Sequence, residues 1–224
     1  MLPPLMCVCG KIVQPKKGLL WNPRTVLCPV CSFKNPLTPS APQSPAECLA
    51  KAEKLVDEKS EDSWKTAVAL TSIALAKTPD SLPCRWIRAF ALDKLKQHSY
   101  TFSDWTACVE GGYRSGSSAM KRGVAYWETG QFESAVRDFD SILYGALFPC
   151  LRSEPINQFD ILMMRGRVLC DAGRFDEAAQ NFDTIAEARG RIGAGTATGR
   201  LAYWQLVARY RGDKEKAQQE WVHM

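Results

Sequence analysis

The chain has 224 residues, of which 29 are Lys or Arg and 24 are Asp or Glu, so its formal net charge is +5. This length is enough for one large domain, or for a domain with a small module, and for a continuous core. No run of about 18 apolar residues occurs, which excludes a membrane-spanning helix. Residues 1–46 contain five basic and no acidic residues, so the whole excess charge belongs to this segment.

Four cysteines cluster within this basic segment, at Cys7, Cys9, Cys28 and Cys31. They form a C-x-C pair and a C-P-V-C pair, and the spacer between the pairs contains short β-like apolar segments at residues 12–13, 19–21 and 26–27. Two such knuckles can present four thiolates to one zinc ion. The pattern resembles a zinc ribbon, although the first knuckle is one residue shorter than the usual C-x-x-C. We therefore expect a zinc-ribbon-like module over residues 1–34 that holds one structural Zn²⁺.

Two alternatives remain for these cysteines, namely unrelated free thiols and redox chemistry at the C-P-V-C pair. The other five cysteines are scattered singly through helical sequence, which is typical of buried free thiols in a reducing compartment. The first residues also lack a basic start followed by an apolar stretch. We expect no cleaved targeting peptide and a cytoplasmic or nuclear location.

Residues 35–46 form a proline-rich linker in which four prolines recur every three residues. This spacing predicts an extended spacer, or a strap on the following domain; a ligand for a proline-reading domain is the alternative. The linker ends where Ser44, Pro45 and Glu47 supply an N-cap, a first-turn proline and a capping-box acid. A helix should begin there.

An internal repeat organises the rest of the chain. The segment GVAYWETGQFESAVRDFDSI, from Gly123 to Ile142, returns as GRVLCDAGRFDEAAQNFDTI from Gly166 to Ile185. Both copies share two glycines, two phenylalanines and an alanine at the same spacing. This skeleton resembles the tetratricopeptide repeat (TPR) family, which implies pairs of antiparallel helices stacked into a solenoid.

The glycines of this skeleton have separate expected roles. Gly123 and Gly166 lie inside helical pattern, where Gly is costly, so we expect a second backbone to approach closely there. Gly130 and Gly173 follow a helical run, where a left-handed turn favours Gly.

Steps of 34 residues extend the repeat over residues 47–224. Earlier units begin at Leu82 and Cys48, and a fourth begins 43 residues after the unit at Gly116. Nine extra residues must therefore lie within residues 144–158, where two prolines forbid one continuous helix. The last unit ends before its second helix is complete. The sequence predicts an all-α solenoid of about four and a half antiparallel helix pairs, preceded by the zinc module.

Catalytic motifs are missing from the sequence. The two histidines, His98 and His223, are far apart, and no nucleophile elbow, phosphate-binding loop or paired-carboxylate motif occurs. We therefore expect a protein that is not an enzyme.

Binding is the remaining function, and the family resemblance implies that the first helix of each pair lines a concave groove. Aromatic residues and Met at these positions suit an apolar helix or an extended peptide. The alternative is that part of this stripe is core between neighbouring units. The predicted groove residues are Trp86, Phe90, Met120, Val124, Trp127, Met163 and Arg167.

The preferred hypothesis is a non-enzymatic adaptor or assembly subunit of a multi-subunit complex that grips a protein segment in this groove. The alternative is a factor associated with RNA or ribonucleoprotein that contacts nucleic acid through its basic zinc module. The residues for that contact would be Lys11, Lys16, Lys17 and Arg24.

Overall fold

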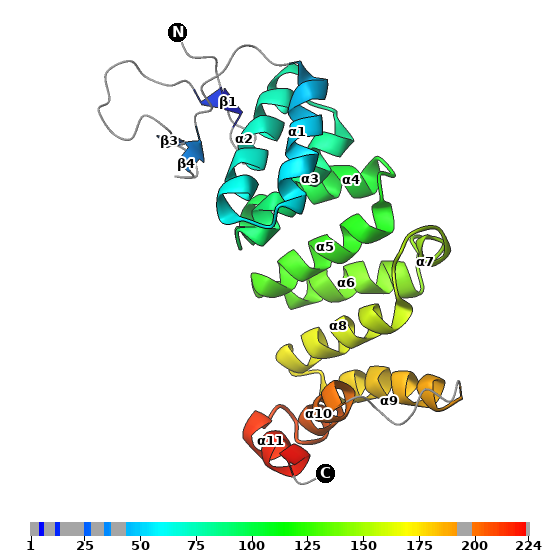
Figure 1. Cartoon of the computed structure of the whole chain (residues 1–224). Helices are drawn as coiled ribbons and strands as arrows, with labels where there is room; N and C mark the ends of the chain where they lie inside the picture. Colours follow the sequence, from blue (N-terminus) through cyan, green and yellow to red (C-terminus); the bar gives the residue numbers. More distant parts are fainter. Residues whose placement is uncertain are drawn as a thin grey trace. The chain divides into compact units, whose positions relative to one another are not determined.

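The computed structural model describes residues 5–6, 12–13, 25–27, 34–36, 44–191 and 199–222 (Figure 1). The chain divides into two compact units, Met1–Ser118 and Ala119–Met224. Cys7, Cys9, Cys28 and Cys31 lie outside the described residues, and so do Lys11, Lys16, Lys17 and Arg24. The predictions that concern them remain predictions.

Two short antiparallel hairpins precede the helices of the first unit. Strand β1 (Leu5–Met6) pairs with β2 (Ile12–Val13), and β3 (Thr25–Leu27) pairs with β4 (Lys34–Pro36). Two of the three predicted β-like segments thus fall in strands, and the third lies outside the described residues. Strands β1 and β4 both lie against helix α2.

Helices of the first unit form two successive antiparallel pairs, as the repeat predicted (Figure 1). Neighbouring helices pack on one another along the chain, and their shared core contains Ala67, Leu75 and Leu92. A 3₁₀ turn, η1 (His98–Tyr100), separates the second pair's helices. The four helices are α1 (Pro45–Asp57), α2 (Glu61–Lys77), α3 (Leu82–Lys94) and α4 (Phe102–Glu110).

The first helix begins where the sequence predicted. The Ser44 side chain accepts a hydrogen bond from the Glu47 N–H, and the Ser44 N–H donates to the Glu47 carboxylate in return. Pro45 occupies the first turn, where a missing N–H costs nothing. The capping box is therefore confirmed.

Helices of the second unit continue the pattern with one interruption. Helix α5 (Ser115–Glu128) starts in the first unit and runs into the second. The extra residues predicted within 144–158 contain only a short helix, α7 (Cys150–Ser153), with exposed Tyr144 and Phe148 before it. The remaining helices are α6 (Phe132–Leu143), α8 (Gln158–Asp171), α9 (Phe175–Arg191), α10 (Gly199–Arg209) and α11 (Lys214–Val222).

In the pairs α5–α6 and α8–α9, the glycine inside the first helix contacts a phenylalanine of the second helix. The prediction that a second backbone approaches this glycine is therefore corrected. A Cβ at Gly166 would lie 2.5 Å from the Phe182 ring, and one at Gly123 would lie 2.9 Å from the Phe139 ring. The close neighbour is thus an aromatic ring of the second helix rather than its backbone. Both rings are fully buried. The turn glycines Gly130 and Gly173 have φ of +75° and +77°, which confirms their predicted role.

A second recurring contact joins the helices of a pair through arginine. Arg88 on α3 donates to Asp104 on α4 at 2.7 and 2.8 Å, with side chains 2% and 0% exposed. Arg122 contacts Asp138 in the same way at 2.9 and 2.7 Å. In both pairs the acceptor follows its arginine by 16 residues. Each pair is thereby fixed by a charge-assisted bidentate contact as well as by apolar packing.

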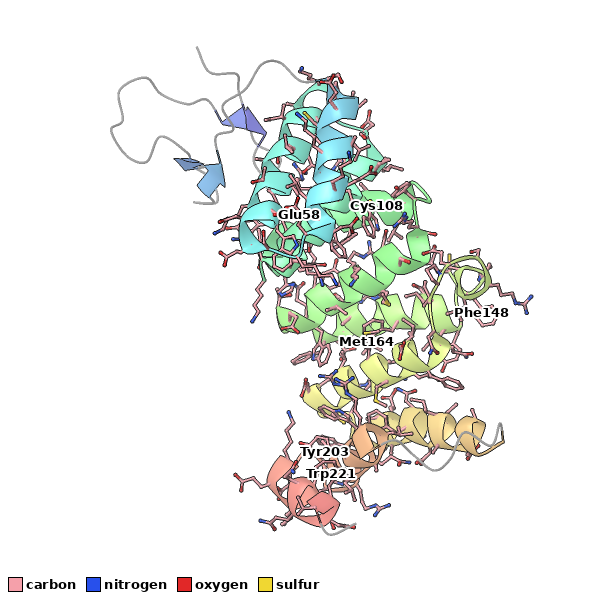
Figure 2. The ribbon with its side chains drawn as sticks, in the orientation of Figure 1. Glu58, Cys108, Phe148, Met164, Tyr203 and Trp221 are labelled. Atoms are coloured by element: carbon pink, nitrogen blue, oxygen red, sulfur yellow. The ribbon has the colours of Figure 1, made fainter. Side chains whose placement is uncertain are left out.

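The last pair ends with partly covered aromatic residues. Tyr203 on α10 and Trp221 on α11 meet edge to face, with ring centroids 6.3 Å apart (Figure 2). Trp221 nevertheless remains 39% exposed and Val222 66%. No helix among the residues described is both long and apolar enough to cross a membrane.

Candidate functional site

The seven predicted groove residues are alike in how far solvent reaches their side chains. Each is partly buried, whereas the small residues Ala119, Gly123 and Ala125 of α5 are buried. A partly buried side chain contacts neighbouring helices on one side and solvent on the other. Partial burial fits both interpretations of the stripe, groove and core, so the groove stays a prediction.

In the first unit, Trp86 and Phe90 stack on one another with ring centroids 5.3 Å apart and planes 15° apart. Trp86 also meets the buried Trp105 edge to face at 6.0 Å and packs against the core cluster. On the solvent side, Arg114 Cζ lies 4.7 Å from the Trp86 ring and Lys94 Nζ lies 5.2 Å from the Phe90 ring. Here the stripe is half core and half an aromatic surface covered by two cations.

In the second unit, three helices bring an arginine and two indoles together. Arg167 on α8 places Cζ 4.6 Å from the centroid of the Trp127 ring, which belongs to α5. The same Cζ lies 5.0 Å from the centroid of the Trp204 ring on α10. Trp127, Arg167 and Trp204 come from the first helices of three successive pairs. These first helices therefore share one surface within the unit.

Polar contacts hold the two indoles in place. The Trp127 indole N–H donates to Asp171 at 2.8 Å, and Lys214 Nζ lies 3.4 Å from the same carboxylate. Lys214 Nζ also lies 5.8 Å from the Trp204 ring. The positions of Trp127 and Trp204 are therefore linked through Asp171 and Lys214, and the surface has a defined geometry.

Sequence reasoning did not single out Trp204, although the repeat contained the signal. Cys170 occupies in the fourth unit the position that Trp127 has in the third, and Trp204 follows Cys170 by 34 residues. Extending the groove positions into the last unit would have found it. Lys214, at the start of α11, has no such repeat signal.

The Arg167 guanidinium is electrostatically unusual. Its Nε is buried without a hydrogen-bond partner in the described part of the chain. Burial lowers the pKa of Arg167 from its ordinary value, and the nearby positive charge of Arg200 lowers it further. The guanidinium therefore has at least one donor that nothing in the described chain satisfies.

The histidine and the cysteines of the described residues have the following surroundings. His98 contacts Asp93 through Nδ1 at 3.3 Å, far along the chain from the indole pair. Four of the five scattered cysteines are buried, as predicted, and burial raises the pKa of Cys108 to about 12 and of Cys170 to about 11. Across residues 44–191 and 199–222, no group of three or more His, Cys, Asp or Glu could hold a metal ion.

Comparison with known proteins identifies the fold. No family model and no curated protein sequence matches the chain. Among solved structures, a putative kinesin light chain from Podosopora anserina with nearly identical TPR-like repeats superposes with a TM-score of 0.64, 15% identity, and coverage of 81% of this chain and 93% of that one. MamA from AMB-1 superposes with a TM-score of 0.55 at 16% identity over 79% and 89% of the two chains. The helical part of the chain has a TPR-like fold.

Proposed function

We propose that the protein is a non-enzymatic adaptor or assembly subunit, which holds a segment of a partner protein against the first helices of its TPR-like pairs. The observation that carries the proposal is the contact of Trp127, Arg167 and Trp204 across three successive pairs. Such a surface offers broad apolar rings beside an unsatisfied donor. These are the features that dominate binding energy at protein interfaces.

A capture experiment with matched variants tests this proposal. The purified chain, its Trp127→Ala variant and its Phe148→Ala variant would each be mixed with cell extract, and bound proteins would be identified after washing at high salt. Phe148 serves as the control because it is 42% exposed in the segment before α7, outside the first helices (Figure 2). We expect a protein retained by the wild type and the control but lost with Trp127→Ala. Equal retention by all three would contradict the proposal.

The nucleic-acid alternative depends on the basic segment before the helices. Lys16→Glu with Lys17→Glu would abolish salt-sensitive RNA binding if that segment contacts phosphates. An adaptor of the proposed kind should instead retain its protein partner at high salt and in this double variant. The two candidate functions therefore differ in which part of the chain they require.

A structural Zn²⁺ in the amino-terminal module is part of the same proposal. The connection between β1 and β2 contains Cys7 and Cys9, and the connection between β3 and β4 contains Cys28 and Cys31. Strands β1 and β4 both contact α2, so the two hairpins pack on the same helix. Four thiolates on two hairpins suit a closed tetrahedral zinc site, which would stabilise the module and leave no position for catalysis.

Metal analysis of the purified chain tests the zinc site. We expect about one zinc ion per chain by mass spectrometry, lost in Cys28→Ser and kept in Cys150→Ser. Cys150 is a suitable control because it belongs to the short helix α7 in the second unit. A wild-type chain purified without zinc would exclude the metal. Buried free thiols elsewhere agree with the reducing cytoplasm or nucleus that we propose for the protein.

A further inference from the structure

Several arginines of the described residues make ion pairs, of which those of Arg209 and Arg211 are the longest, at 3.8 and 3.7 Å. Five of them pair with a carboxylate inside their own unit, at N–O distances from 2.6 to 3.2 Å. Arg167 contacts two indole faces without an ion-pair partner in the described chain, as Arg114 contacts the Trp86 and Tyr113 rings, but Arg167 also has its Nε buried without a hydrogen-bond partner. The five arginines with short ion pairs are Arg85, Arg88, Arg122, Arg165 and Arg174.

Stacking leaves the guanidinium edge of Arg167 as its free side. Cation–π contacts with Trp127 and Trp204 occupy ring faces and use none of the five N–H donors of arginine. Nε is buried, while the terminal nitrogens are not among the buried unsatisfied atoms. The rings therefore orient a planar fork, whose terminal N–H donors are not used by any ion pair among the described residues. A planar fork matches the two oxygens of a carboxylate.

Charges around the fork favour an anion, but only a small one. Arg200 and Lys214 add two cations near Arg167, and the carboxylates of Asp171 and Glu128 also lie close enough to act on it. Three cations against two carboxylates leave a small positive excess. A single carboxylate satisfies that excess, whereas a nucleic acid would bring a phosphate at every nucleotide against two resident acids.

We propose that Arg167, framed by Trp127 and Trp204, binds an Asp or Glu side chain of the partner segment. This inference rests on the proposed function, since it assigns the chemistry of a partner at the same surface. The carboxylate accepts from the guanidinium fork, and apolar neighbours of the acid in the segment cover the outer edges of the indoles. Arg167 is thus a specificity residue for acidic segments.

A peptide display library provides the probe, since the partner is unidentified. Random twelve-residue peptides would be selected on the intact chain, and the recovered peptides would be synthesised for fluorescence anisotropy. We expect recovered peptides to share one Asp or Glu. Replacing that acid by its amide should weaken binding about tenfold or more, because hydrogen bonds to charged groups contribute at least that factor.

Variants of the protein separate the fork from its charge. Arg167→Met should weaken the acidic peptide about tenfold or more, and it should make the acid and amide peptides bind alike. Arg167→Lys keeps the charge and the ring contact but loses the planar fork, so an intermediate loss is expected. Arg152→Met removes a positive charge from an exposed side chain of α7 and should change nothing. Circular dichroism of each variant checks that the helices remain folded.

The outcomes distinguish this inference from the proposed function. Peptides that bind through Trp127 but contain no shared acid would overturn the inference and leave the adaptor proposal intact. Failure to recover any peptide would count against both. Binding of a twelve-nucleotide polyuridine probe that Arg167→Met abolishes, without peptide binding, would show that the fork takes phosphate and would refute a protein segment as its ligand. If the Arg167→Met variant does not fold, the affinities of the acid and amide peptides for the wild-type chain still test the inference.

Discussion

Replacing Asp104 by Asn should destabilise the first unit by about 3 kcal/mol, near the lower end of the loss seen when one partner of a buried ion pair is removed. Asp104 is fully buried and accepts both hydrogen bonds of Arg88, whose side chain is 2% exposed. Arg85 adds a third contact at 3.2 Å. The amide retains one acceptor but leaves the Arg88 charge without a counter-ion in a buried site, and this residual charge is the source of the loss.

Urea unfolding of the full chain, followed by circular dichroism, measures the change in stability. Hydrogen exchange of peptides from α3 and α4 then localises it, because repeat solenoids can lose structure one unit at a time. Glu61→Gln is the matched control, since Glu61 pairs with Lys65 at a site where the two side chains are 69% and 51% exposed. Exposed pairs contribute little, so its midpoint should not move. Equal shifts in the two variants would refute the reasoning.

Four further predictions follow from local geometry. Gly166→Ala should destabilise the second unit by about 1–2 kcal/mol, since overpacking against Phe182 outweighs the gain in helix propensity; urea unfolding measures it. Ser44→Ala removes the capping box and should cost about 1 kcal/mol, seen as faster hydrogen exchange in the first turn of α1. At pH 8, iodoacetamide should modify Cys150 and spare Cys108, as mass spectrometry would show. Burial raises the pKa of Cys108 from 9.0 to about 12, so the folded state holds this proton more tightly and stability should fall as pH rises from 9 to 12.

The helix pairs could be predicted because their contacts recur with the sequence period. Gly123 meets Phe139, and Gly166 meets Phe182, in the same arrangement. This arrangement requires a small residue on one helix and a ring on the next, so the sequence must repeat it. The arginine contacts recur with the same period. Arg122 follows Arg88 by 34 residues. Charged residues inside helical sequence are usually assigned to a solvated face, which hid this signal.

The candidate site was less predictable because it depends on how successive pairs pack. Trp127, Arg167 and Trp204 lie far apart in sequence, and only the stacking of α5, α8 and α10 brings them together. The period places each residue on the first helix of its pair, but the rotation from one pair to the next is not encoded in any single repeat. The unpaired state of Arg167 also depends on its neighbours. Sequence alone could therefore nominate Arg167 but could not separate it from the structural arginines.

Helix α8 shows why binding and stability can be tested apart. Arg165 and Arg167 are two positions apart, which turns their side chains by about 200° around the helix. Arg165 accordingly contacts Asp140 at 2.6 Å and Asn181 at 3.1 Å, toward the neighbouring helices α6 and α9. Arg167 faces the two indoles instead. Arg165→Met should therefore lower the urea midpoint, whereas Arg167→Met should alter ligand preference with a smaller change in stability. If both variants lost stability equally, Arg167 would be a structural residue and the surface around it part of the core.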